Sequence, residues 1–286
     1  MSKLSGFYIN LDRSTERRAH MDAMLAKLGV TNAYARVPAI EGATLPLNES
    51  TLKPGELGCF LSHVKALKTV PPGGDTAAHI MEDDAVLSPH VLGAAGLFER
   101  AFENFDVVFT ETFTGFDLLD LRFYLDTFKR ATAQGQPAFR LLDISRKPFA
   151  GATSYYVAPR AVEKLAAAEE AAMGKGPKLP IDIALRLLAN AGQIRVATVF
   201  PFMSTIRLED IANTTIAERA AQANNPAVLA AMLLRYAFYI DSDIAGHARR
   251  FLSQIPGPAI PASGDPRRDL VMKIAAFVLS DEFKPF

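Results

Sequence analysis

Three consecutive acidic residues, Glu82-Asp83-Asp84, directly follow an apolar run at residues 77–81. The run predicts a buried strand, and carboxylates at the carboxyl end of a strand lie where open α/β sheets bind their ligands. Side chains alternate along an extended segment, so Glu82 and Asp84 could share a face while Asp83 turns away. Such oxygens suit a hard cation, Mg²⁺ or Mn²⁺, that also holds substrate phosphates. The alternative is a solvated acidic turn before the next helix.

A polar and basic cluster follows the first apolar run, at residues 7–11. Asn10-Leu11-Asp12-Arg13 leads into Arg17 and Arg18, close to the expected start of a helix. Forked guanidinium donors at such a position can bind a diphosphate. The alternative is a capped helix with a solvated basic face.

Residues 55–63 carry two glycines and two polar side chains that could serve a ligand. Gly55 and Gly58 permit another backbone or a ligand to approach closely. Ser62 and His63 could then supply hydrogen bonds to that ligand. The alternative is that His63 is a structural residue and Cys59 a small buried hydrophobe.

Asp182 follows Pro180-Ile181 and leads into the apolar stretch 183–188. Aspartate is strongly favoured as a helix N-cap, which is the structural interpretation of this residue. A catalytic carboxylate is the other interpretation.

Short β-like runs alternate with helix-like stretches over the first two-thirds of the chain. Strands are expected at 7–11, 77–81, 106–110, 154–158 and 194–200. Met21, Met24, Leu25 and Leu28 mark one helix face, which Gly29 ends, and Pro54 suits the first turn of another helix. This alternation predicts an α/β domain with a mainly parallel sheet over residues 1–205. No strand is expected after about Arg207, so we predict a helical subdomain over residues 206–286.

Composition excludes several classes of protein. The 286 residues carry 31 basic and 31 acidic side chains, which argues against nucleic acid as the main partner. The single cysteine excludes intrachain disulfides and zinc sites built from several thiolates, and the five histidines show no metal-ligand spacing among themselves. The first residues contain no apolar core of signal-peptide length. The best apolar run, residues 227–240, is interrupted by Arg235 and is too short to span a membrane. We therefore expect a cytoplasmic protein.

Taken in order, the motifs resemble glycosyltransferase family 25, the lipopolysaccharide-type galactosyltransferase family that also includes collagen galactosyltransferases. The matching stretches are 7–13 with Arg17-Arg18, 39–42, 55–59 with Ser62-His63, and 80–84. Weaker similarity lies at 151–157 and 180–182. Residues 105–114 and the helical end depart from the family pattern, which leaves the acceptor open.

The resemblance implies a nucleotide-sugar-binding catalytic domain of the glycosyltransferase A type over residues 1–205. It also implies a UDP-sugar donor, a divalent metal and inversion at the anomeric carbon. The metal, Mn²⁺ first and Mg²⁺ second, would lie on Glu82 and Asp84. The donor side would be formed by Asn10, Leu11, Arg13, Arg17, Arg18, Ser62, His63 and Asp83.

An inverting transfer needs a carboxylate base beside the acceptor and positive charge on the departing phosphates. Resemblance and topology together make Asp182 the expected base. The expected sugar is galactose, and the expected acceptor is a saccharide or glycolipid of lipopolysaccharide or another surface polysaccharide. Peripheral contact with the inner membrane and a homodimer both stay open.

Two other functions compete with sugar transfer. A sugar-phosphate nucleotidyltransferase also uses a layered α/β fold with acidic metal ligands, but its first strand normally leads into a glycine-rich segment, which residues 9–13 lack. A non-catalytic nucleotide- or carbohydrate-binding protein could persist on a decayed transferase scaffold. The intact Glu82-Asp83-Asp84 argues against that decay.

Overall fold

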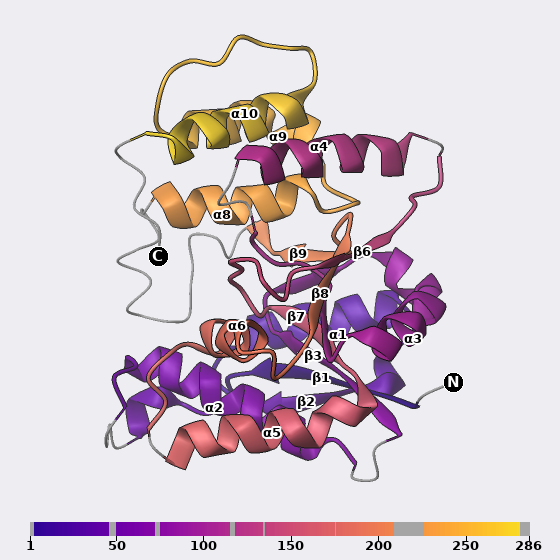
Figure 1. Ribbon diagram of the computed structural model, residues 1–286, viewed down its shortest axis with the longest axis vertical. Helices are drawn as coiled ribbons and strands as arrows, with labels where there is room; N and C mark the ends of the chain where they lie inside the picture. Colours follow the sequence, from indigo (N-terminus) through magenta and orange to yellow (C-terminus); the bar gives the residue numbers. More distant parts are fainter. Residues whose placement is uncertain are drawn as a thin grey trace.

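A seven-stranded sheet in the order β2-β1-β3-β7-β5-β8-β6 forms the centre of the structure, a computed structural model (Figure 1). It describes residues 3–45, 50–71, 75–114, 118–133, 135–174, 176–208 and 226–280. The strands of this sheet are β1 (Lys3–Asn10), β2 (Tyr34–Pro38), β3 (Thr76–Glu82), β5 (Val107–Phe109), β6 (Arg140–Asp143), β7 (Ser154–Val157) and β8 (Val196–Phe200). A separate antiparallel pair joins β4 (Ala85–Leu87) to β9 (Ser204–Ile206).

Five strands of the large sheet run in one direction, and β7 and β6 run in the other. The mainly parallel sheet expected from the sequence is therefore present, with two reversed strands that the pattern did not show. The five expected strands all form, with ends that differ by a few residues. The expectation missed β2 and β6, which are the two edges of the sheet. Both are partly exposed and so lack the continuous apolar run of a central strand.

The helices are α1 (Thr15–Lys27), α2 (Pro54–Thr69), α3 (Ala95–Asn104), α4 (Leu118–Thr132), α5 (Pro159–Gly174), α6 (Ile181–Asn190), α8 (Pro226–Ala237), α9 (Ile244–Gln254) and α10 (Pro266–Val278). Short 3₁₀ turns lie at Thr31–Ala33, Gly42–Thr44 and Pro89–Gly93. The helix expected around residues 21–28 is α1, which buries Met21 and Leu25. Gly29 follows it with a φ of +71°, a conformation that glycine adopts at little cost. The helix expected at Pro54 is α2, and it packs beside α5 and against β1–β3 (Figure 1).

The close approach expected at Gly58 is made by backbone. A Cβ atom at this position would lie 2.5 Å from the carbonyl oxygen of Ile40 and 2.8 Å from the amide nitrogen of Gly42. No larger side chain fits there, because both neighbours are main-chain atoms. Gly58 thus lets α2 lie against the segment that follows β2.

Four helices, α4, α8, α9 and α10, form a second hydrophobic core at one end of the sheet (Figure 1). Tyr124 and Phe128 of α4 pack there with Phe200, Phe202 and Phe238. As expected, the described residues beyond Ile206 form no strand of either sheet. Helix α4, which comes from the middle of the α/β region, packs in the same core. None of the described helices is long and apolar enough to cross a membrane.

Candidate active site

Polar residues collect at the carboxyl edge of the parallel strands. The register places Ile9 of β1 opposite Glu82, and Met81 of β3 opposite Ser154 at the start of β7. Phe109, the last residue of β5, pairs with Tyr155. The residues at these positions or within two residues of them therefore share one edge: Asn10, Glu82, Asp83, Asp84, Glu111 and Thr153. Open α/β sheets bind their ligands at this edge.

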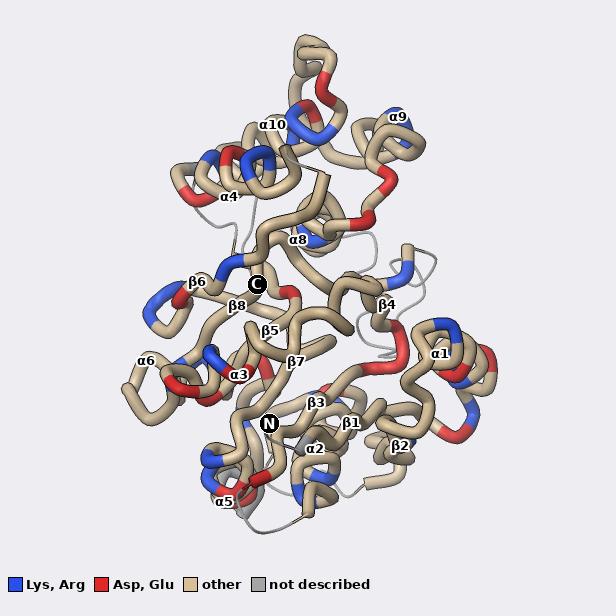
Figure 2. The backbone as a smooth tube through the Cα atoms, turned by 90° about the vertical axis from the view of Figure 1, so that its right-hand side faces the viewer, with Lys and Arg blue, Asp and Glu red and all other residues tan. Residues whose placement is uncertain are grey.

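Asp83 turns into the protein. Its side chain accepts a hydrogen bond from Asn10 Nδ2 at 2.7 Å and one from Arg17 Nη1 at 2.9 Å, and the residue is 7% exposed. Burial raises the pKa of Asp83 above its usual value, although Arg17 and Asn10 act in the opposite direction. The alternation expected along the acidic segment is therefore present at Asp83. Through these two hydrogen bonds Asp83 connects the acidic segment to β1 and α1. Figure 2 shows α1 beside the acidic stretch between β3 and β4.

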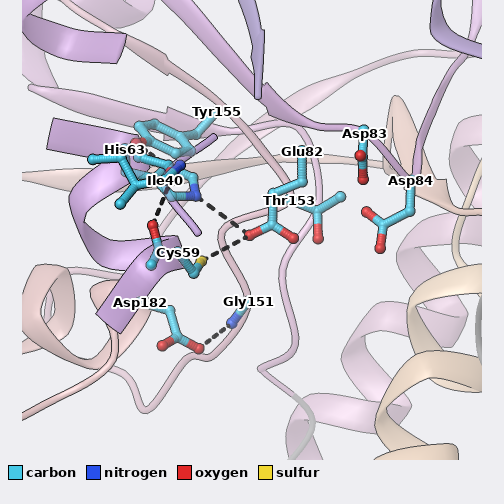
Figure 3. Close-up of polar contacts among 12 residues, drawn as sticks. Ile40, Cys59, His63, Glu82, Asp83, Asp84, Gly151, Thr153, Tyr155 and Asp182 are labelled. Carbon is cyan, nitrogen blue, oxygen red and sulfur yellow. Dashed lines mark hydrogen bonds and ion pairs between the residues drawn. The ribbon is translucent and has the colours of Figure 1, made fainter. Parts of the chain in front are cut away.

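The carboxylates of Glu82 and Asp84 have different neighbours. Asp84 Oδ2 lies 3.4 Å from Arg17 Nη1. Glu82 Oε1 lies 3.3 Å from Nε2 of His63 and 3.7 Å from Sγ of Cys59, and the Glu82 side chain is 33% exposed. Figure 3 shows the Glu82 side chain extending toward α2 and the Asp84 side chain beyond Thr153. The segment thus presents one carboxylate to α2 and one to α1.

Ser62 and His63 are both fully buried and make their hydrogen bonds inside the protein. The Ser62 hydroxyl donates to the carbonyl oxygen of Gly58 at 2.6 Å and accepts from the Ile40 amide at 2.8 Å. His63 Nδ1 lies 2.9 Å from the hydroxyl of Tyr155, while Nε2 faces Glu82. Of the two, His63 therefore lies beside the acidic segment and Ser62 ties α2 to the chain after β2.

The three arginines after β1 point in different directions. Arg17 is 8% exposed and pairs with Asp83 and Asp84. The half-exposed side chain of Arg13 contacts Glu41, and Arg18 lies 3.8 Å from Asp22 one turn later in α1. Leu11 is half-buried, and its carbonyl oxygen accepts a hydrogen bond from the Ser14 amide. Of these three arginines, only Arg17 therefore forms ion pairs with the acidic segment.

Asp182 lies in the first turn of α6 but is not its N-cap, which corrects the structural interpretation made from the sequence. The N-cap is Pro180. Asp182 Oδ2 instead accepts a hydrogen bond from the Gly151 amide at 2.8 Å, and Oδ1 accepts one from the Ile183 amide at 2.9 Å. The carboxylate thereby ties α6 to the segment that leads into β7, as Figure 3 shows.

A buried ion pair, Glu111–Arg235, joins this edge to the helical core. Arg235 of α8 contacts both Glu111 oxygens through Nε and Nη2, and Nη2 donates to Thr153 Oγ1 at 2.8 Å. Glu111 is 0% exposed and Arg235 7%. Burial lowers the pKa of Arg235, but the attraction of Glu111, and then of Asp84 and Glu82, more than offsets it, so the pKa is raised. The site thus contains a permanent cation close to its carboxylates.

The sequence of residues 4–185 matches the family model described as glycosyltransferase family 25 (LPS biosynthesis protein). The chain belongs to glycosyltransferase family 25. It is therefore a glycosyltransferase of lipopolysaccharide biosynthesis, with a sugar donor and an acceptor to bind, and its α/β architecture is compatible with a glycosyltransferase fold. No curated protein sequence matches the chain.

The matched region of family 25 contains the acidic segment, Arg17, Glu111 and Asp182, but it ends before β8. Arg235 lies outside it. Sequence reasoning missed both Glu111 and Arg235, since neither belongs to a motif. It also missed Arg36 of β2, whose Nε donates to Asn10 Oδ1 at 2.9 Å. These residues are brought to the site by the fold alone.

Proposed function

We propose that this family 25 enzyme transfers a hexose, galactose first, from a UDP-sugar to a saccharide or glycolipid acceptor, with inversion at the anomeric carbon. Residues 1–205 would then be a nucleotide-sugar-binding domain of the glycosyltransferase A type. The observation that carries the proposal is the acidic segment Glu82–Asp84, braced by Asn10 and Arg17 at the carboxyl edge of β3. Neighbouring carboxylates repel one another, and a divalent cation that also binds the donor phosphates would offset that repulsion.

The donor side suits a divalent cation, Mn²⁺ or Mg²⁺, with Glu82 and Asp84 as its protein ligands. Hard cations in such sites take one or two carboxylates and fill their other positions with water and substrate phosphates. Glu82 and Asp84 supply the carboxylates that such a cation takes, and because they face α2 and α1, one or both side chains would turn to share it. When bound, the cation would neutralise charge on the departing diphosphate. Arg17 holds Asp83 and Asp84 in place, and Arg13 and Arg18, both half-exposed, would meet the donor only by leaving Glu41 and Asp22.

The acceptor side is assigned to Asp182. An inverting transfer is one displacement, in which the acceptor hydroxyl attacks the anomeric carbon while a carboxylate accepts its proton. Asp182 is half-buried, and two backbone amides fix the direction of its carboxylate. Two other carboxylates that could serve as the base lie elsewhere. Asp120 of α4 pairs with Lys147, and Asp143 lies on edge strand β6 opposite Ala197. Asp117 lies outside the described residues.

The test is thermal unfolding with UDP, with Mn²⁺ or with chelator present. A ligand at a hundred times its dissociation constant stabilises the folded state by about 2.7 kcal/mol, which is readily measured as a rise in Tm. We expect a much larger rise with Mn²⁺ than with chelator. Asp84→Asn should abolish the difference, and Glu99→Gln on α3 should leave it unchanged. Equal stabilisation under both conditions would remove the cation from the proposal.

Incubation with UDP-galactose, UDP-glucose and UDP-N-acetylglucosamine then identifies the donor, since a transferase slowly hydrolyses its own donor even without the right acceptor. The anomeric configuration of the product, read by NMR, tests inversion. Consumption of UTP and a sugar 1-phosphate would instead identify a nucleotidyltransferase. Binding of UDP with no turnover of any donor or acceptor would favour a non-catalytic protein.

A further inference from the structure

Cys59, His63 and Glu82 bring three metal-ligand atoms together beside the acidic segment (Figure 3). Cys59 and His63 are four residues apart on α2, so they share one face of the helix. Glu82 is the last residue of β3. Sγ, Nε2 and a carboxylate oxygen all lie within 4.8 Å of one another, and no other three His, Cys, Asp or Glu residues of the described chain do so.

We propose that these three residues form a binding site for a thiophilic divalent cation, with Zn²⁺ as its type. Zinc bonds of about 2.3 Å to sulfur and about 2.0–2.2 Å to nitrogen and oxygen, at tetrahedral angles, place sulfur roughly 3.5 Å and nitrogen roughly 3.3 Å from the oxygen. The observed separations from Glu82 Oε1 are 3.7 Å to Sγ and 3.3 Å to Nε2. These two separations lie within a few tenths of an ångström of the expected values, and Sγ and Nε2 lie within 4.8 Å of each other.

Tyr155 holds the imidazole of His63 in the orientation that a ligand requires. Its hydroxyl lies 2.9 Å from Nδ1, and the two rings stack with their centroids 5.7 Å apart. Metal-bound histidines almost always fix their second ring nitrogen in this way. With the proton on Nδ1 donated to the Tyr155 oxygen, Nε2 presents its lone pair toward Glu82 and Cys59.

The donor set selects the class of cation. Thiolate and imidazole ligands favour Zn²⁺ and Co²⁺, whereas Mg²⁺ and Mn²⁺ prefer oxygen. Thiolate and carboxylate together carry two negative charges, which balance the charge of the ion. The nearby guanidinium of Arg235 is already neutralised by Glu111. Three protein ligands leave a fourth position open, as in zinc sites that accept water or substrate.

Without metal, hydrogen bonds connect the three side chains. The Cys59 thiol donates toward Glu82 Oε1, and His63 Nε2 lies within hydrogen-bond range of the same oxygen. Binding replaces the thiol proton and moves the imidazole proton from Nε2 to Nδ1, so one proton is released for each ion bound. This inference does not rest on sugar transfer. It does connect to it, because Glu82 is shared with the cation proposed for the donor.

Cobalt titration of the full chain tests the site directly, because the single cysteine makes any thiolate-to-cobalt absorption band a report on Cys59. We expect a band that saturates at one Co²⁺ per chain, disappears on adding Zn²⁺, and is absent in Cys59→Ser and Glu82→Gln. Tyr155→Phe keeps the ring and loses the hydroxyl, so it should weaken the affinity roughly 10–100-fold. Zn²⁺ should also protect Cys59 from alkylation by iodoacetamide.

Asp84→Asn and Asp182→Asn are the matched controls, since both carboxylates lie near the site but outside the ligand set. They should keep the cobalt band, and Asp84→Asn should meanwhile lose the Mn²⁺-dependent response to UDP. The two proposals therefore fail separately. A folded protein that responds to UDP and Mn²⁺ yet shows no cobalt band and no protection of Cys59 would overturn the site. So would a band that survives Glu82→Gln.

Discussion

At the scale of single residues, the site is organised by which face of α1 and α2 each polar side chain occupies. Arg17, Met21 and Leu25 are spaced by four and form the buried stripe of α1, so Arg17 is carried to the acidic segment. Arg18 lies one position further round the helix and reaches Asp22 at the surface. The buried position of Arg17 and the exposed position of Arg18 could be predicted from the sequence, because the apolar periodicity indicates the buried face of the helix. The partner of Arg17 was not readable, since it depends on how β3 lies against α1.

Asp182 gives the sharpest test at this scale. Asp182→Asn keeps an oxygen that can accept the Gly151 amide hydrogen bond but cannot accept a proton from the acceptor. We expect turnover to fall roughly 10²–10⁴-fold, as for loss of a general base. Stability should fall by about 1 kcal/mol, since the single oxygen of Asn keeps the Gly151 hydrogen bond and the one from the Ile183 amide is lost. The measurements are the transfer rate, UDP affinity and urea unfolding.

Asp243→Asn is the control, because Asp243 is a true N-cap whose Oδ1 accepts from the Gly246 amide on α9, in the helical core. Its turnover should be that of the parent. Transfer by Asp182→Asn at the parent rate would make Asp182 a tie between α6 and the segment before β7, and nothing more.

At the scale of elements, the central strands and the first helices follow from local pattern, whereas the edges and the helical core do not. Buried strands such as β3 and β8 are continuous apolar runs, and α1 has a clear helical period. Edge strands β2 and β6 carry no such signal. The sequence likewise did not show that α4 belongs to the helical core. An apolar helix face predicts burial, but it does not indicate which element the helix packs against.

The contact between α8 and the sheet edge was equally unpredictable, since Glu111 and Arg235 are 124 residues apart. Arg235 interrupts the apolar run at residues 227–240, and the local pattern indicates no partner for it. In the structure it lies against Gly151, where a Cβ would be 3.2 Å from Nη1, and it bonds Thr153. The same segment holds Asp182 through Gly151 and the Glu82 amide through the Thr153 carbonyl oxygen.

We therefore expect the helical core to affect catalysis through Arg235. Arg235→Met leaves the Glu111 carboxylate buried without its cation, which should cost about 3–5 kcal/mol of stability. Adding Glu111→Met removes the unpaired charge and should recover part of that loss, with a coupling of roughly 0.5–3 kcal/mol. Because the segment 151–153 loses its anchor, the refolded double variant should still turn over more slowly than the parent. Urea unfolding and kcat are the measurements.

Lys273→Met provides a matched control for this pair. Lys273 is a buried cation of α10 whose Nζ donates to the carbonyl oxygens of Gly257 and Pro258, within the helical layer. It should lose stability and keep its kcat. If the Glu111–Arg235 double variant also kept a full kcat, the helical layer would support the sheet without shaping the site.

At the scale of the whole molecule, stability and the site depend on the same central strand. β3 ends in the acidic segment, and three residues earlier it carries His79, which is fully buried. The His79 ring stacks on Tyr156 at 3.9 Å, and its nitrogens lie 2.6 Å from the Tyr34 hydroxyl and 2.9 Å from Ser154 Oγ. Burial lowers the pKa of His79 to about 3. Protonation of this ring is therefore opposed by the folded state.

The pH dependence of unfolding should show this opposition. An unfolded chain protonates a histidine near pH 6.5, whereas folded His79 stays neutral down to about pH 3. Between these values the unfolded state binds the extra proton, so stability is lost as the pH falls, by up to about 1.4 kcal/mol per pH unit. From pH 7.5 to pH 5 this one residue should remove about 2 kcal/mol. His79→Gln has no such proton to bind. Its free energy of unfolding, measured with urea, should therefore fall by about 2 kcal/mol less than the parent's over the same pH interval.

His90→Gln is the control, because it removes an exposed histidine and should leave the parent's pH dependence in place. Equal pH dependence in all three proteins would show that His79 is not the group whose protonation opposes folding.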